Sequence, residues 1–147
     1  LSGMSSQLFE KIRDEKGLAY YVGSTRTLGL QTSMFVIYAG THPDQSQAVI
    51  EEIDAELDRI RLGDVSDLEL ERCRTRLKAA RVMGRQTIGA RAMHAATNFS
   101  YGLPVDNDAD YIAKLDACDG KSLMRFVAEY FNLKKRVQLV LGPNLIK

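Results

Sequence analysis

The sequence has few of the residues that build disulfide-stabilised or metal-dependent proteins. Its 147 residues include two cysteines, Cys73 and Cys118, and two histidines. A scaffold held by several disulfides is therefore excluded, although a single bridge is not. No apolar run approaches the ~18–20 residues that a membrane-spanning helix needs. The 20 basic and 19 acidic residues leave a formal net charge of +1, so the chain is neither a polycation nor a polyanion.

What is present is the composition of an ordinary soluble globular protein, with 45% apolar and 27% charged residues. The length falls within the ~100–200 residues of one domain, so we expect a single domain over residues 1–147. The sequence opens at Leu1 without a methionine, and a helical pattern starts at once. We therefore expect this domain to lack its first strand and helix.

The first part of the chain has the pattern of a helix followed by a hairpin. A short helix starts at residue 5 or 6 and ends between residues 13 and 15, and Gly17 stands where a helix-ending glycine belongs. Residues 18–26 alternate like a strand. Residues 33–39 form a nearly continuous apolar run, which is typical of a central strand buried on part of both faces.

After the hairpin the apolar residues recur with a helical period. The first stripe predicts a helix that ends at Gly63, and it consists of Val49, Ile50, Ile53, Leu57 and Ile60. Ser66 and Glu69 have the spacing of a capping box, which starts the next helix. The order of elements predicts an α+β two-layer sandwich, with helices packed on one face of a mostly antiparallel or mixed β-sheet. Further helices are predicted over residues 90–101, 108–117 and 121–131, and a closing strand over 137–141.

Charge is unevenly distributed along this helical part. Residues 44–71 are rich in acidic side chains, whereas residues 72–91 contain seven basic and no acidic ones: Arg72, Arg74, Arg76, Lys78, Arg81, Arg85 and Arg91. A basic helix can bind phosphates, so nucleic-acid binding through Arg72–Arg91 is one interpretation. The favoured interpretation is two neighbouring helices whose solvent faces carry opposite charge. No aromatic residue interrupts the basic run, so it offers no platform on which bases could stack.

The chemistry-bearing residues do not form a complete catalytic site. His42 lies beside Pro43, and neither His42 nor His94 has a histidine or glutamate at metal-ligand spacing. Both are interpreted as structural or surface histidines. Cys73 lies on an apolar helix stripe, where a buried thiol is usual, and Cys118 has no histidine nearby to activate it. We therefore predict no catalytic residue and no metal ligand in this chain.

One segment stands out, in which a helix end runs through a glycine turn into a strand. Arg13 lies in the last helical turn, and Tyr20 follows seven residues later. A guanidinium can donate two parallel hydrogen bonds to a carbonyl or carboxylate, and a phenol can add a third. The pair could therefore hold an extended peptide or stabilise its oxyanion. The alternative is structural: a cation that complements the helix dipole and a half-buried strand tyrosine.

The same segment resembles a known family. The run Leu1–Phe9, followed by Ile12-Arg13 and by Gly17-Leu18-Ala19-Tyr20, is similar to the C-terminal-type domain of the M16 zinc metallopeptidases. This family includes pitrilysin, insulin-degrading enzyme and the mitochondrial processing peptidase. Ser2 and Gln7 depart from a glycine and an arginine that are common there.

The resemblance implies an α+β domain that is repeated in tandem, with copies that close around a peptide chamber. It also implies that zinc is held by an inverted His-x-x-Glu-His motif in the N-terminal-type domain, which this sequence lacks. Arg13 and Tyr20 match the arginine and tyrosine that bind substrate near that zinc. The chain is thus expected to be the non-zinc domain of a zinc metalloendopeptidase, inactive on its own and binding no cofactor.

The expected partners are a zinc-binding M16 domain, on the same polypeptide or on a separate subunit, and a peptide substrate. A homo-oligomer is also compatible with the sequence, whereas nucleic acid and membrane partners are not expected. The alternative within the same fold is a proteolytically inactive partner or a structural subunit of the core-protein type. The protein is expected to be soluble, and cytoplasmic or periplasmic if its source is bacterial.

Overall fold

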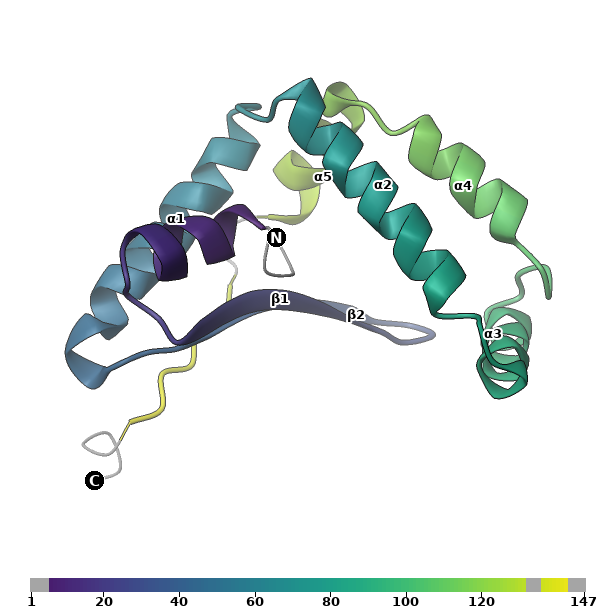
Figure 1. Ribbon diagram of the computed structural model, residues 1–147, viewed down its shortest axis with the longest axis horizontal. Helices are drawn as coiled ribbons and strands as arrows, with labels where there is room; N and C mark the ends of the chain where they lie inside the picture. The colour runs from purple at the N-terminus through teal and green to yellow at the C-terminus, as the bar shows by residue number, and fades with distance from the viewer. Residues whose placement is uncertain (1–5, 132–135, 143–147) are drawn as a thin grey trace. The chain divides into compact units, whose positions relative to one another are not determined.

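The computed structural model describes residues 6–131 and 136–142. The chain divides into two compact units, each of which is treated by itself below. Unit 1 comprises residues 1–62 together with 128–147, and unit 2 comprises residues 63–127. Figure 1 shows the elements of both units along the chain. The single domain over residues 1–147 stays a prediction.

Unit 1 is built on the expected hairpin. Strands β1 (Tyr21–Leu28) and β2 (Ser33–Gly40) pair antiparallel, with Tyr21 opposite Gly40 at one end of the ladder. The N–H of Gly29 donates to the carbonyl of Thr32 at 2.9 Å and closes the turn. The described residues therefore form an α+β fold with a two-stranded antiparallel sheet, which is simpler than the predicted mixed sheet.

Helices η1 (Phe9–Glu15) and α1 (Ser46–Arg61) pack against some of the apolar side chains of this hairpin. Their shared core contains Leu8, Ile12, Ala19, Val22 and Val49. Leu8 and Ile12 are fully buried, and each such side chain contributes about 1.5–3 kcal/mol through its burial. The helix predicted from residue 5 or 6 to 15 is thus present, although η1 has π-helical hydrogen bonding.

The prediction for β2 was wrong in one respect, because this strand is not buried on both faces. Met34, Phe35 and Tyr38 are 58%, 44% and 47% exposed. Ile37 and Ala39 pack against the core, and the ring centroid of Phe35 lies 5.0 Å from that of Phe131. These contacts leave the strand partly exposed. A continuous apolar run shows that a strand is hydrophobic, but it does not show how many layers cover it.

A buried carboxylate joins η1 to α1. Glu56 is 3% exposed and accepts hydrogen bonds from Lys11 Nζ at 2.9 Å and from Arg59 Nε and Nη2 at 3.0 and 2.8 Å. Burial raises the pKa of Glu56, but the hydrogen bonds from Arg59 and Lys11 outweigh it and hold the pKa below its ordinary value of 4.5. Lys11 comes from η1, so this ion pair fixes η1 against α1. A short 3₁₀ turn, η2 (Pro43–Gln45), leads into α1.

Unit 2 is helical throughout its regular elements. Helix α2 (Asp67–Met83) starts with the predicted capping box, in which Glu69 N–H donates to Ser66 Oγ at 3.2 Å and Ser66 N–H donates to Glu69 Oε2 at 3.3 Å. Thr87 Oγ1 caps the next helix by accepting from Ala90 N–H at 3.1 Å. The helices that follow are α3 (Ile88–Ser100), α4 (Asp108–Asp116) and α5 (Gly120–Tyr130), the last of which ends in unit 1.

Two basic side chains of α2 form ion pairs with acidic side chains of α4. Arg81 Nε lies 2.8 Å from Asp108 Oδ1, and Lys78 Nζ lies 2.5 Å from Asp116 Oδ1. For these residues the counter-charge therefore comes from a later helix, and not from the acidic run that precedes α2. This pairing accounts for part of the basic run without a nucleic-acid partner.

Two further predictions were wrong. Residues 136–142 form no strand, and Val137 and Leu141 are 97% and 82% exposed. A β-forming sequence needs a strand edge with which to pair, and no described strand pairs with this segment.

Cys73 is exposed instead of buried, and α2, on which it lies, has no buried residue. Both cysteines are free in the structure. Within the described residues, no helix combines the length and apolarity needed to cross a bilayer.

Candidate functional site

Arg13 lies in the last turn of η1 with its side chain exposed. Its guanidinium carbon is 4.6 Å from the centroid of the Phe9 ring, one helical turn earlier. This cation–π contact restrains the side chain while leaving the donor edge of the guanidinium free for a ligand. Among the described residues, no carboxylate pairs with Arg13.

A tight turn joins Arg13 to the strand that follows. Gly17 has φ +61°, a left-handed conformation that a side chain would strain even though a Cβ would meet no atom within 4 Å. The N–H of Gly17 donates to the Arg13 carbonyl at 3.1 Å, and the N–H of Leu18 donates to the Ile12 carbonyl at 2.8 Å. These bonds close the end of η1 and fix where the chain leaves it.

Tyr20 lies directly before β1 and is 76% exposed. Its backbone N–H donates to the carbonyl of Gly40 at 2.8 Å, so the main chain is held although the phenol is in solvent. A half-buried strand tyrosine, the structural alternative, is therefore not what the structure shows. No described contact joins the side chains of Arg13 and Tyr20.

The chain between Gly17 and Tyr20 lines a shallow hollow of about 120 Å³. His42 and Gln45 complete its wall, and both were missed as site residues by sequence reasoning. The signal that places them here is the hairpin register, because Tyr20 N–H pairs with Gly40 and residues just after β2 must then lie beside residues just before β1. His42 is exposed, and its Nδ1 is 3.3 Å from Asp44 Oδ2.

The chemistry that this surface supports is recognition. The hollow presents a phenol, an imidazole and an amide, and Arg13, which does not line it, presents a guanidinium at the end of η1. All of these groups can bind carbonyl or carboxylate oxygens. Within residues 6–131 and 136–142, no group of three or more His, Cys, Asp or Glu side chains is placed to hold a metal ion. A zinc site requires three or four such ligands, so the described donor set does not fit zinc.

Comparison with known proteins identifies one matching family and several similar proteins. The family described as "Peptidase M16 inactive domain" matches residues 1–77. A protein from Streptomyces coelicolor named an uncharacterized zinc protease is 31% identical over 145 residues, which is 96% of this chain and 30% of that protein. Another uncharacterized zinc protease, from Rickettsia bellii, is 33% identical over 67% of this chain and 24% of its own length.

Solved structures show the same fold. A protease from Helicobacter pylori superposes with a TM-score of 0.76 at 25% identity, covering 89% of this chain and 32% of that one. A conserved protein from Enterococcus faecalis gives a TM-score of 0.74 at 22% identity, with coverages of 86% and 29%. The chain thus spans about a quarter to a third of the length of the proteins it matches.

Proposed function

Since the chain belongs to the M16 peptidase family, as its C-terminal domain of the inactive type, we propose that it is the substrate-binding, non-zinc part of a zinc metalloendopeptidase. Arg13 and Tyr20 are the residues proposed to contact the peptide. The observation that supports this role best is that both side chains are exposed on either side of the hydrogen-bonded Gly17 turn. Neither is used by the described core.

Arg13 is suited to donate hydrogen bonds to the carbonyl or carboxylate oxygens of a peptide. A guanidinium offers two parallel N–H donors, and the Phe9 ring already limits its rotation, so less side-chain entropy is lost when a ligand binds. Tyr20 adds an O–H donor and apolar ring area. The pair would orient the peptide and stabilise negative charge that develops on its carbonyl oxygen.

The proposed partner is a zinc-holding domain on the same polypeptide or on a separate subunit. A zinc ion held by that domain would supply Lewis-acid activation of water. Because the described residues do not fit zinc, no role in metal binding is proposed for this chain.

The test is peptide turnover by the complete protein or assembly that contains the zinc half. Arg13→Gln is expected to lower kcat/KM by about 10- to 100-fold, because a charge-assisted hydrogen bond contributes roughly 1.5–3 kcal/mol. Tyr20→Phe should lower it by less, about 5- to 10-fold, because it removes one neutral donor. Folding should be unaffected, since both side chains are exposed.

Matched controls are available on the hairpin. Arg26→Gln removes an exposed arginine from β1, and Tyr21→Phe changes the tyrosine next to Tyr20. Both controls should leave turnover close to the unmodified level. Turnover that is equal in all four variants would contradict substrate binding by Arg13 and Tyr20, and would favour the structural-subunit alternative.

A further inference from the structure

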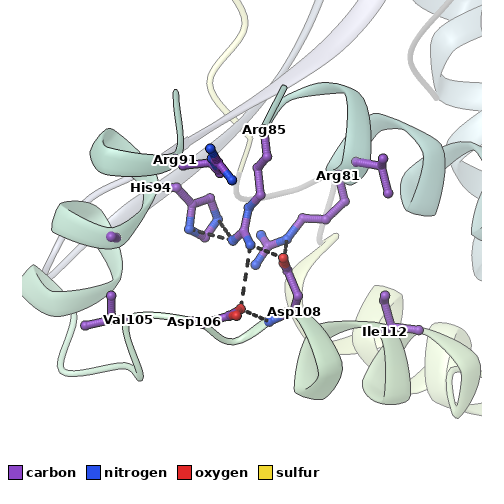
Figure 2. Close-up of a pocket in the computed structure, with 10 residues that line it drawn as sticks. Arg81, Arg85, Arg91, His94, Val105, Asp106, Asp108 and Ile112 are labelled. Atoms are coloured by element: carbon purple, nitrogen blue, oxygen red, sulfur yellow. Dashed lines mark hydrogen bonds and ion pairs between the residues drawn. The ribbon is translucent and has the colours of Figure 1, made fainter. Parts of the chain in front are cut away.

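A second, larger cavity lies wholly within unit 2. Its volume is about 520 Å³, which falls in the range of small-molecule sites. Side chains near the end of α2, from α3, from the loop before α4 and from α4 itself line it, as Figure 2 shows. One part of the wall is apolar and consists of Val82, Ala95, Val105 and Ile112.

Arg81, the first cation of this cavity, contacts three residues of the protein. Its Nε lies 2.8 Å from Asp108 Oδ1, its Nη2 donates to the Asn107 side chain, and its guanidinium lies 4.4 Å from the Tyr111 ring centroid. The hydrogen bond from Arg81 also holds the pKa of Asp108 below its usual range. Arg81 is therefore a structural residue that keeps Asp108 ionised.

Arg85 is only partly engaged. Its Nη1 pairs with Asp108 and lies 3.8 Å from Asp106 Oδ1, and its Nη2 contacts the His94 ring nitrogens at 2.6 and 2.7 Å. Its Nε, however, is buried and has no hydrogen-bond partner among the residues that the structure describes. Because this atom is not accessible to solvent, it cannot contact a ligand in the cavity, and Arg85 contributes there through its charge.

Arg91 supplies an unpaired positive charge. It lines the cavity from α3, and its side chain has no hydrogen bond or ion pair to any described residue. Figure 2 shows Arg91 among the residues that line the cavity, with no dashed line to it. Burial, together with the charges of Arg81 and Arg85, lowers the pKa of His94, so the imidazole is neutral. The two aspartates therefore leave one of the three guanidinium charges uncompensated.

We propose that this cavity binds a carboxylate that carries an apolar group, with the exposed guanidinium of Arg91 as the donor. The single excess positive charge matches a monoanion, because a phosphate with nearly two negative charges would exceed it. The apolar wall accounts for the second part of the ligand, since it would contact an aliphatic side chain. Two sources share this chemistry, the C-terminal residue of a peptide and a free aliphatic acid.

The test uses the full chain and measures affinity by isothermal titration calorimetry. The probe is N-acetyl-leucine, and its matched control is N-acetyl-leucinamide, which has the same apolar group without the charge. The carboxylate should bind at least about tenfold more tightly than the amide, because hydrogen bonds to an ionised group are the strong ones. Acetate should bind more weakly than N-acetyl-leucine, because it lacks the apolar group.

Variants assign the binding to the cavity. Arg91→Gln should weaken N-acetyl-leucine binding about tenfold through the loss of a charge-assisted contact. Arg72→Gln should leave it unchanged, because Arg72 is exposed on α2 and does not line the cavity. Equal effects of the two variants would overturn the proposal, as would equal binding of the acid and the amide or no binding of either.

Two further probes separate the sources and the rival ligand. A tripeptide that ends in leucine should bind more tightly than 4-methylpentanoate if the ligand is a peptide terminus, and no more tightly if it is a free acid. Both results support a carboxylate site. Inorganic phosphate that binds as tightly as N-acetyl-leucine would overturn it.

Discussion

Different interactions stabilise the interior of unit 1 and the interior of unit 2. In unit 1, Leu8 and Ile12 are fully buried between the hairpin and α1, and one buried carboxylate, Glu56, is satisfied by two cations. In unit 2, α2 has no buried residue, and ion pairs such as Arg81–Asp108 join it to α4. Salt screens partly exposed ion pairs, whereas apolar burial does not depend on attraction between charges. The two units should therefore respond differently to the same perturbation.

The largest effect is expected in the core of unit 1. Ile12→Ala removes a fully buried side chain and should lower the free energy of unfolding by about 2–5 kcal/mol, because it leaves a cavity. Leu77→Ala is the matched change on α2, where the side chain is 40% exposed, and should cost less than about 1 kcal/mol. Urea titration followed by circular dichroism measures both values. Similar losses of unfolding free energy at the two positions would contradict the proposed difference between the two units.

The next effect concerns the buried carboxylate. Glu56→Gln leaves Lys11 and Arg59 beside a neutral amide and should cost about 2–3 kcal/mol. Glu52→Gln, on the same helix, breaks the more exposed pair with Lys16 and should cost less than about 1 kcal/mol.

Acid titration checks the same residue independently. The pKa of Glu56 is lowered by folding, so its contribution is complete above its ordinary value of 4.5 and is lost as the pH falls through the lower folded value. As the pH falls below about 4.5, the unmodified chain should lose stability more steeply than the Glu56→Gln variant. Parallel curves for the two proteins would show that Glu56 does not contribute in this way.

These contrasts show which features the sequence could predict. The capping box of Ser66 and Glu69 was predicted correctly, because it depends on four consecutive residues. The helix end at Arg13 and the glycine turn at Gly17 were also predicted correctly, again for local reasons, whereas β1 begins at Tyr21 and not at residue 18 as predicted. The strand over residues 137–141 and the place of His42 depend on pairing between distant segments, which a pattern along one chain does not determine.

The ion pairs of unit 2 lead to a smaller effect that depends on salt. Asp108→Asn removes the shared partner of Arg81 and Arg85 and should cost about 0.5–1 kcal/mol, because the Asp108 side chain is 39% exposed. The cost should shrink as salt is raised from ~0.1 to ~1 M, where the Debye length falls to about 3 Å. Hydrogen exchange of α2 and α4 amides reports on this unit, and β1 and β2 amides serve as the control. A cost that is independent of salt would show that packing, and not charge, joins α2 to α4.

The smallest effect is expected from His94. Its titration should make unit 2 lose stability at a higher pH than unit 1. Its pKa is lowered by burial first and by Arg81 and Arg85 next, so the neutral ring is the stable form in unit 2. Its stabilisation is complete above the ordinary value of 6.5 and declines as the pH falls toward the folded value, whereas Glu56 has no effect until the pH reaches about 4.5. Amide exchange in α3 should therefore speed up slightly as the pH falls below 6.5, after correction for intrinsic rates, while that of β1 and β2 stays constant above about pH 4.5. His94→Gln should remove this pH dependence, because glutamine keeps a polar group beside Arg85 but does not titrate. A pH dependence that persists in His94→Gln would assign it to another group and would leave the two units alike in mild acid.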